Sequence, residues 1–559
     1  MKISALLMIW LALATPAAAQ NSPTDLWPVP DWALATPESQ GMSSADLADL
    51  VESILKQGDP IHQLLVIRNG RILLEAAFHP FQKNAPHNLY SCTKSVTSTL
   101  IGIAIGQGKI GGVDRRVLSF FPERTIAHRD ARKEAMTLEH LLTMTTGLDW
   151  SEWGIPYGNP DNISWKWLRS PDAVQFVLDA PMSVDPGSRF NYNSGASHLL
   201  AAILRKETGQ SPLAFAREQL FQPLGISDAS WQADAQGNEL GGTGLRLRPR
   251  DLARIGYLFL HGGSWQGRQI VPAEWVRTAV TSHVSVSESQ GYGYQWWIES
   301  KGGFAAQGFG GQTLWVMPEL QLIVVTTAGA PGEEGTLPRT LMELFVFPAV
   351  RSAGPLPENP EGRARLAAAL RAAEQPVARP VPPLPATARK ISGRAYKLAG
   401  NGLGWRTIAL TFEGTEARVD LETREGTDRF PVGLDDVFRT ARIEKTVDLA
   451  AKGRWEKGEF VLRVYDLAEA DWSESRFRFT GDRVEIATNW PVSGYRERLR
   501  GRARPRRTSA PGGGRATGAA GRDRFPRSRD PQPPGGPAGE VRIPRPQTAA
   551  AAVTASRVG

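Results

Sequence analysis

The sequence predicts an α+β fold: one antiparallel sheet flanked by helices, a helical insert within it, and a small all-β domain after it. Three observations favour this class. Two blocks of β-type alternation stand far apart in the chain, helical periodicity fills the span between them, and a third block of alternation follows a proline-rich stretch.

The first block opens with an amphipathic helix and continues as a hairpin. Apolar residues recur at helical spacing from about Ser44 to Gln57. Asn69-Gly70, the strongest short hairpin signal, then separates two alternating runs, Leu65–Arg68 and Arg71–Leu74. The core stripe expected of the helix consists of Leu47, Leu50, Val51, Ile54 and Leu55.

The second block supplies the rest of the sheet. Its expected strands are Tyr292–Glu299, Phe304–Gln307, Gln312–Met317 and Leu322–Thr327. A helix over about Arg339–Val350 closes the block. Antiparallel pairing of the two blocks would give a sheet of about five strands covered by the terminal helices. The intervening segment, Asp114–His283, is mostly helical, and a ligand cleft is expected where it meets the sheet.

The C-terminal part of the chain has a different organisation. Residues 353–389 are typical of a proline-rich linker with one short helix over Gly362–Ala373. Short alternating strands with glycine turns follow in residues 390–500 and predict a small β-sandwich or barrel. Because no catalytic-type residues cluster there, we expect this domain to cover or shape its neighbour.

The N-terminus has the pattern of a secretory signal peptide. Lys2 precedes an apolar run that ends near Ala14, and a small-residue cleavage site ends at Ala19. We expect a signal peptide over residues 1–19, a lead-in over 20–42 and a first domain over 43–352. The mature protein would be periplasmic or secreted, with no transmembrane segment. Its single cysteine, Cys92, excludes an intrachain disulfide and is interpreted as a small core residue.

Residues 501–559 account for the basic balance of the chain. They hold twelve Arg and three acidic residues, so residues 1–500 carry a net charge of −1 within the total of +8. Their Pro-, Gly-, Ala- and Arg-rich composition cannot form a core and predicts a disordered tail. Alternatively, the tail could serve as an anchor, bind nucleic acid, or be an out-of-frame extension of the gene. The near-neutral body gives no sign of nucleic-acid binding.

Ser91 and Lys94 form the first candidate site. Three residues apart on a helix, they share one face, and a desolvated amine can take the proton of a serine hydroxyl. The residues that follow are apolar on nearly all sides, which indicates a buried helix whose N-terminal N–H groups can bind an oxyanion. Ser53 and Lys56 have the same Ser-x-x-Lys spacing, but they lie on the solvent-exposed face of their helix and are expected to have no function.

The second element is Pro186–Gly195, a turn and short extended piece before the helix that starts at Ala196. Tyr192 is either a loop-tip residue that relays the serine's proton or an ordinary half-buried aromatic residue. Ser194 is either a site residue or the N-cap of the following helix.

The third element is Gln307–Thr313, which contains Gly308, Gly310 and Gly311. Glycines in a strand usually mark a close approach of the backbone to another group. The stretch is therefore either a strand edge that offers N–H groups to a substrate, or a bulge or tight turn.

Together these elements resemble the serine β-lactamase and penicillin-binding-protein superfamily, and within it the class C-like serine hydrolases. The matching stretches are Ser91-Cys92-Thr93-Lys94, Tyr192-Asn193-Ser194 at the place of Tyr-x-Asn, Phe309-Gly310-Gly311 at the place of Lys-Thr-Gly, and Thr137–Leu142 with Thr146-Gly147-Leu148. The resemblance covers about Ser43 to Arg351 and implies the superfamily's mixed helix–sheet fold.

The resemblance also implies roles for individual residues. Ser91 would be the acylated nucleophile, and Lys94 and Tyr192 would share the proton transfers. The backbone N–H groups of Ser91 and Gln312 would form the oxyanion hole, with an uncertainty of one residue at Gln312. Ser194 and the Phe309-Gly310-Gly311 stretch would contact the substrate.

Two departures from the superfamily pattern affect the expected specificity. Asn193 is shifted by one position from the superfamily's Asn, and Phe309 replaces the cationic residue that helps β-lactam-recognising relatives bind the substrate carboxylate. Aromatic residues near the motifs, including Trp150, are core residues or, as a group, the walls of an apolar acyl pocket.

The sequence therefore predicts an exported serine hydrolase that cleaves an ester or small amide through a Ser91 acyl-enzyme. A β-lactamase or DD-peptidase on the same scaffold, and a catalytically silent binding or sensor domain, are the alternatives. The eight His and single Cys show no metal-binding spacing, so neither a metal nor a cofactor is expected. The expected partner is a small molecule, and the sequence specifies neither the natural substrate nor an oligomeric state.

Overall fold

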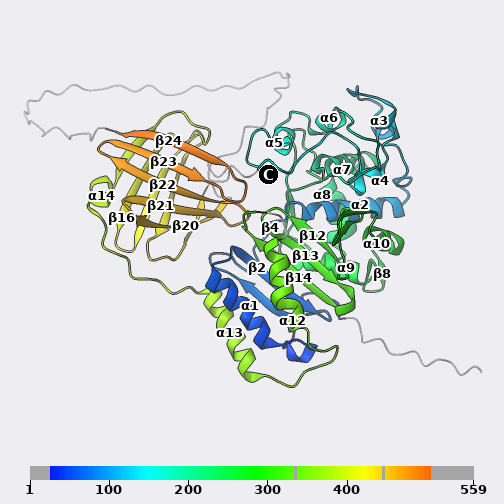
Figure 1. Cartoon of the computed structure of the whole chain (residues 1–559), viewed down its shortest axis with the longest axis horizontal. Helices are drawn as coiled ribbons and strands as arrows, with labels where there is room; N and C mark the ends of the chain where they lie inside the picture. Colours follow the sequence, from blue (N-terminus) through cyan, green and yellow to red (C-terminus); the bar gives the residue numbers. More distant parts are fainter. Residues whose placement is uncertain (1–25, 333–335, 444–446, 505–559) are drawn as a thin grey trace, which may run out of the picture.

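The computed structural model describes residues 26–332, 336–443 and 447–504. A mixed helix–sheet domain carries a helical insert on one side of its sheet, and a β-barrel formed by the following part of the chain lies beside it (Figure 1). This architecture confirms the predicted fold class. The expected signal peptide and the tail from residue 505 lie outside the described residues.

The central sheet unites the two predicted β blocks in one antiparallel core. Its strand order is β1-β3-β2-β14-β13-β12-β11-β10-β9. In chain order the strands are β1 Ala33–Leu34, β2 Ile61–Arg68, β3 Arg71–Ala77, β9 Val284–Ser287, β10 Gln290–Tyr292, β11 Trp297–Glu299, β12 Phe304–Gly308, β13 Gln312–Met317 and β14 Leu322–Ala328. Strand β14 pairs with β2 across the junction of the blocks, with Val324 opposite Val66. The sheet has nine strands rather than the expected five or so, because the short strands β1, β9, β10 and β11 extend its two edges. Strand β1 is the exception to the antiparallel pairing and runs parallel to β3.

The predicted strand Tyr292–Glu299 is wrong as a single element. It contributes to two short strands, β10 and β11, which pair as a hairpin with Tyr292 opposite Trp297. The chain reverses because Gln295 adopts a left-handed conformation, with φ of 64°. The backbone N–H of Gln295 donates to the carbonyl oxygen of Leu142, 3.0 Å away, and so ties this turn to the helical insert.

Helix α1, Ser44–Gln57, begins and ends as its sequence predicts. The Ser43 hydroxyl accepts a hydrogen bond from the Asp46 backbone N–H, and Gly58 ends the helix in a left-handed conformation. Four residues of the expected stripe are buried, but Leu55 is 39% exposed, because it lies at the edge of the apolar face. The covering helix near residue 340 is broken into α11 Thr336–Leu341, a π-helical turn over Met342–Val346, and α12 Phe347–Ala349.

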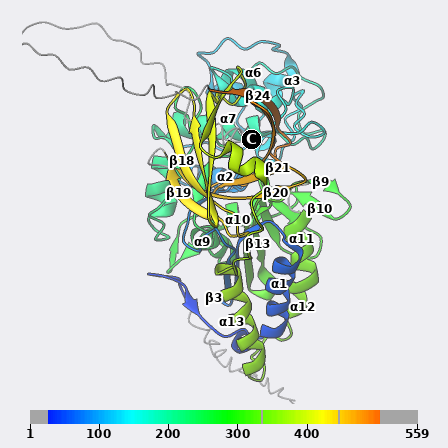
Figure 2. The same ribbon diagram turned by 90° about the vertical axis from the view of Figure 1, so that its left-hand side faces the viewer.

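The segment predicted to be a linker includes part of the first domain. Helix α13, Pro360–Glu374, lies alongside α1, as the turned view shows (Figure 2). Leu366, Ala369 and Ala373 on one face of α13 are buried in the same core as α1, so only the proline-rich residues after this helix remain as a connection.

Helix α2, Cys92–Gly106, lies at the centre of the domain. Residues from Cys92 to Ala104 are buried on every face, because the sheet covers one side and the insert helix α7, Ser194–Thr208, packs on the other.

The remaining insert helices are α3 Ala131–Ala135, α4 Leu138–Leu142, α5 Ile163–Leu168, α6 Ala173–Leu178, α8 Pro212–Ala216, α9 Pro249–Leu260 and α10 Ala273–Ala279. Two small sheets complete the domain: β4 His87–Asn88, β5 Ser230–Trp231 and β6 Leu245–Leu247, and β7 Ser264–Trp265 with β8 Arg268–Gln269.

The all-β domain is a barrel rather than a sandwich. Its ten strands run in the order β18-β17-β16-β15-β24-β23-β22-β21-β20-β19, and a contact between β18 and β20 closes the sheet. In chain order they are β15 Arg394–Leu398, β16 Thr407–Glu413, β17 Glu416–Glu422, β18 Thr427–Gly433, β19 Arg439–Ile443, β20 Val447–Glu456, β21 Glu459–Asp466, β22 Trp472–Thr480, β23 Arg483–Asn489 and β24 Arg496–Ala503. Helix α14, Ala386–Ile391, leads into the barrel, and β24 continues past the predicted boundary at residue 500.

The described ranges contain no helix that is both long enough and apolar enough to cross a membrane.

Candidate active site

Ser91 lies at the N-terminus of α2, as its sequence context predicts. The preceding residue, Tyr90, has φ of 46°, a conformation that is uncommon for residues other than glycine and is held here by surrounding structure. The turn lifts Ser91 to a half-buried position, while Cys92, the next residue, is fully buried. The Cys92 thiol donates to the Gln312 carbonyl oxygen at 3.4 Å and packs the start of β13 against the first turn of α2.

The side-chain nitrogen of Lys94 lies directly beside the Ser91 hydroxyl. Its Nζ atom is 2.9 Å from the Oγ of Ser91, 2.9 Å from the Oγ of Ser194 and 2.8 Å from the carbonyl oxygen of Gly242. Lys94 is only 2% exposed, so these polar partners replace the water that would otherwise solvate it. An amine in this position can accept the Ser91 proton.

Tyr192 contributes an aromatic wall next to Lys94. The lysine Nζ lies 4.8 Å from the centre of the Tyr192 ring, within the range of a cation–π interaction. The ring stacks on Trp153 and on Trp297, with ring-centre distances of 5.4 and 6.0 Å. The structure thus brings all three predicted catalytic side chains together, Ser91 and Lys94 from the start of helix α2 and Tyr192 from the loop before α7.

Ser194 was expected to be either a site residue or the N-cap of the following helix, and the N-cap position is taken by its neighbour Asn193. Asn193 is the N-cap of α7, because its side-chain oxygen accepts from the Ala196 backbone N–H at 2.9 Å. Ser194 is the first residue inside the helix, and its hydroxyl points to Lys94 and to the carboxylate of Glu152. The shift of the asparagine by one position therefore places a serine against the lysine.

The third motif is a tight turn between strands β12 and β13. Gly308 pairs with Gln312 across the turn, and both Gly310 and Gly311 have left-handed φ angles, of 77° and 94°. A side chain on Gly308 would come within 2.4 Å of the Leu89 carbonyl oxygen, so its absence permits the close backbone approach of β12 to the segment before Ser91. The Gln312 side chain fixes the turn by donating to the Phe309 carbonyl oxygen at 2.7 Å.

A narrow cavity of about 20 Å³, enough for about one water molecule, lies beside Ser91. The lining consists of uncharged residues: Tyr90, Ser91, Tyr157, Ser164, Trp167, Leu168, Ser194, Thr243 and Phe309. Trp150, predicted to contact substrate, is absent from this lining. It is buried behind it, where its indole Nε1–H donates to Glu152 at 2.6 Å.

The barrel contacts the active-site segment through a buried carboxylate. Glu469, between β21 and β22, accepts hydrogen bonds from the Tyr90 hydroxyl at 2.7 Å and the Asn88 side-chain amide at 2.9 Å, and it pairs with Arg246. Burial alone would raise the pKa of Glu469, but the Arg246 guanidinium and these hydrogen bonds hold the pKa below its usual range. The next residue, Ala470, packs against Tyr90 and Phe309. The barrel therefore supports the strained residue before Ser91.

Glu469→Gln is expected to destabilise the protein by about 3 kcal/mol, because it leaves the buried side of Arg246 without its counter-charge. The value is at the lower end of the range for such changes, since the Arg246 side chain is 22% exposed. Urea unfolding at pH 7 measures the change. The matched control is Asp448→Asn, which breaks the exposed barrel pair between Asp448 and Arg442 and should cost less than about 1 kcal/mol. Equal losses in the two variants would contradict a buried interdomain ion pair.

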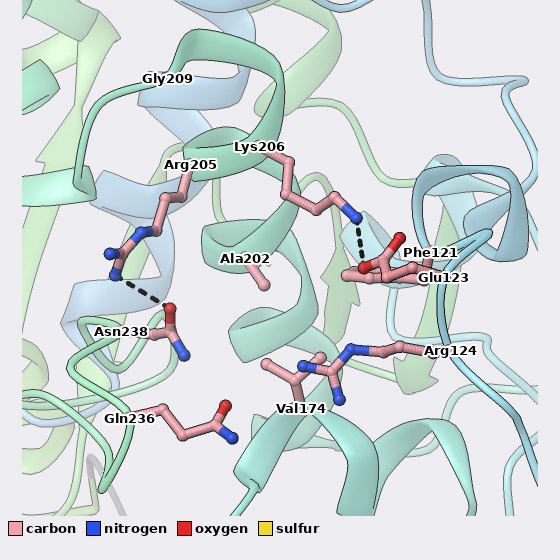
Figure 3. A pocket seen from close by; sticks show the side chains of 10 residues that line it. All are labelled: Phe121, Glu123, Arg124, Val174, Ala202, Arg205, Lys206, Gly209, Gln236 and Asn238. Carbon is pink, nitrogen blue, oxygen red and sulfur yellow. Dashed lines mark hydrogen bonds and ion pairs between the residues drawn. The ribbon is translucent and has the colours of Figure 1, made fainter. Parts of the chain in front are cut away.

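A second hollow on the helical insert has a different character (Figure 3). Its charged side chains are engaged with neighbours: Lys206 pairs with Glu123 at 2.6 Å, and Arg205 donates to Asn238 at 3.0 Å. The lining consists of Phe121, Glu123, Arg124, Val174, Ala202, Arg205, Lys206, Gly209, Gln236 and Asn238 and includes no serine or cysteine nucleophile. We therefore place the chemistry at Ser91.

Three groups near Lys94 and Ser91 were missed by sequence reasoning: the Glu152 carboxylate, the Gly242 carbonyl oxygen and the barrel's Glu469. None lies at a spacing from Ser91 that a local pattern would detect, and Glu152 lies in a loop rich in tryptophan that periodicity does not describe. Within the described ranges, no group of three or more His, Cys, Asp or Glu side chains is arranged to hold a metal ion.

Comparison with known families agrees with this geometry. The family model described as "Beta-lactamase" matches residues 47–346, which is more than half of the chain. The chain belongs to the beta-lactamase family. As a member of this family whose relatives are named as hydrolases and esterases, it is a serine hydrolase.

Individual relatives match parts of this beta-lactamase-family chain. The 6-aminohexanoate-dimer hydrolase of Paenarthrobacter ureafaciens is 26% identical over 283 residues, covering 48% of this chain and 72% of the relative. Esterase EstB of Burkholderia gladioli is 28% identical over 217 residues, covering 35% of this chain and 54% of the relative, so the match spans about half of that esterase. Among solved structures, the octameric penicillin-binding protein homologue from Pyrococcus abyssi has a TM-score of 0.45 and 17% identity, covering 81% of this chain and 99% of that one.

Proposed function

We propose that this serine hydrolase is exported and cleaves neutral esters or small amides through an acyl-enzyme on Ser91. The observation that carries the proposal is the hydrogen bond of 2.9 Å between Lys94 and Ser91, beside a cavity whose lining bears no charged side chain. The names of two relatives, a 6-aminohexanoate-dimer hydrolase and an esterase, support the same substrate classes. Export rests on the signal-like pattern of residues 1–19.

The proposed reaction follows from the positions of the side chains. Lys94 takes the proton of Ser91 as the serine oxygen bonds to the substrate carbonyl carbon, and the carbonyl electron pair moves onto oxygen. That oxygen would be stabilised by backbone N–H groups at the start of α2 and of β13, Ser91 and Gln312 by analogy with the superfamily. The proton then passes to the departing alkoxide or amine, and water repeats the sequence to release the acid.

Phe309 argues against a substrate that carries a carboxylate near the third motif. Its ring is 6% exposed and lies 5.3 Å from the Tyr90 ring and 5.5 Å from the Tyr157 ring, centre to centre. An anion placed there would lose water and gain no charged partner from the cavity lining. A neutral acyl group would instead gain apolar contact with these rings.

We expect clear turnover of short-chain p-nitrophenyl esters and poor turnover of nitrocefin by the same preparation. A charge-assisted hydrogen bond is worth about 1.5–3 kcal/mol, so the missing cation should reduce kcat/KM for the β-lactam by about 10- to 100-fold. Phe309→Lys should shift the ratio of the two activities toward nitrocefin, and Phe309→Leu, which stays apolar, should not. A higher kcat/KM for nitrocefin in the wild type would favour a β-lactamase or DD-peptidase instead.

A further inference from the structure

Glu152 is a buried carboxylate that accepts hydrogen bonds from three donors and faces a fourth. Its side chain is 2% exposed. One carboxylate oxygen accepts from the Trp150 indole N–H at 2.6 Å and from the Ser194 backbone N–H. The other accepts from the Ser194 hydroxyl at 2.9 Å and faces the Tyr157 hydroxyl at 3.4 Å. A carboxylate can only accept hydrogen bonds, so it determines which way these donors point.

The first consequence concerns Ser194. A hydroxyl carries a single hydrogen, and in Ser194 that hydrogen points to Glu152. Toward Lys94, whose Nζ lies 2.9 Å from the same oxygen, Ser194 can therefore present only lone pairs. Glu152 thus makes the Ser194 hydroxyl a hydrogen-bond acceptor for the lysine.

The second consequence concerns the orientation of the Lys94 amine. The Gly242 carbonyl oxygen, 2.8 Å from Nζ, is also an acceptor. A neutral amine has two hydrogens and one lone pair. If its hydrogens are directed to Gly242 and Ser194, its lone pair is left to face the Ser91 hydroxyl, whose oxygen is 2.9 Å away. This is the arrangement that a general base needs in order to accept the proton of Ser91.

We propose that Glu152 is a positioning residue that acts through Ser194 to direct the Lys94 lone pair at Ser91. The proposal rests on the proposed function, since it assumes that Lys94 accepts the Ser91 proton. In that step the Ser91 O–H bond breaks, the N–H bond on Lys94 forms, and the serine oxygen bonds to the carbonyl carbon. Glu152 gains and loses no proton in the step.

Glu152→Gln tests the proposal with the full chain and p-nitrophenyl butyrate as the probe. The new amide N–H₂ can donate to the Ser194 oxygen, so that the serine proton is free to turn toward Lys94 and compete with Ser91 for its lone pair. We expect kcat to fall about 10- to 100-fold, which is less than the loss expected when the general base itself is removed. KM should change less than about threefold. Glu152→Asp keeps the charge and should retain more of kcat than Glu152→Gln.

A double-mutant cycle separates this effect from a loss of packing. In the Ser194→Ala background the link to Lys94 is absent, so adding Glu152→Gln should lower kcat little further. A purely structural role predicts instead that the two losses in kcat multiply, and that result would overturn the proposal. If Glu152→Gln does not fold, the Ser194→Ala cycle run with Glu152→Asp gives the same comparison.

The matched control is Glu38→Gln. Glu38 is also a buried carboxylate of the first domain, 3% exposed, and it accepts from the Ser44 backbone N–H at 2.9 Å. The loss of the Glu38 charge in Glu38→Gln should lower the melting temperature of the protein without changing kcat. An inactive wild type would count against the proposed function itself, whereas an active wild type with an equally active Glu152→Gln variant would overturn only the role of Glu152.

Discussion

Ser91→Ala is expected to abolish ester hydrolysis and labelling by a fluorophosphonate probe, while Ser53→Ala leaves both unchanged. Both serines precede a lysine by three residues on a helix. Only Ser91 has that lysine buried, at 2% exposure and 2.9 Å from its hydroxyl. Lys56 is exposed on α1, so its side chain is surrounded by water rather than held against Ser53 in a buried site.

Intact-mass analysis after probe treatment measures this prediction directly. Wild type and Ser53→Ala should gain the mass of one phosphonyl adduct, and Ser91→Ala should gain none. Removal of the nucleophile should cost about 10⁴-fold or more in turnover, as the loss of a member of a catalytic triad does. Equal labelling of the two variants would refute Ser91 as the nucleophile.

Lys94→Ala and Tyr192→Phe are each expected to lower turnover by about 10²-fold or more. Lys94 provides the amine against Ser91, and its removal also leaves the inward-facing Ser194 oxygen and Gly242 carbonyl without their donor. Tyr192 lies against the same amine, with its ring centre 4.8 Å from Nζ. The phenylalanine keeps the ring and its stacking on Trp153, so the change isolates the hydroxyl.

If the two groups act as one proton-transfer unit, as the superfamily resemblance implies, the loss in the double variant should be far smaller than the product of the two single losses. Steady-state kcat/KM of the two single variants and the double variant completes the cycle. Circular dichroism of each variant serves as the control for folding. A double variant whose loss equals the product of the single losses would mean that Lys94 and Tyr192 contribute independently, which contradicts the shared-base mechanism.

Much of the fold follows from local sequence. Asn69-Gly70 predicts the β2–β3 hairpin because few other dipeptides fit its turn, and Ser43 and Gly58 mark the ends of α1. Gln295 shows where this reasoning stops. Its left-handed backbone divides a predicted strand, and its N–H is bonded to Leu142 in the insert, a partner that strand alternation cannot reveal.

The candidate site divides in the same way. The sequence by itself determined that Ser91 and Lys94 share one face of a buried helix, because their spacing and the apolar residues after them are local properties. Only the tertiary structure decided what surrounds that face. Glu152 reaches Lys94 through Ser194, and Glu469 of the barrel holds Tyr90, by hydrogen bonds between residues far apart in the chain. Periodicity reports that a side is buried, but the identity of the polar groups that meet there depends on how loops and domains pack.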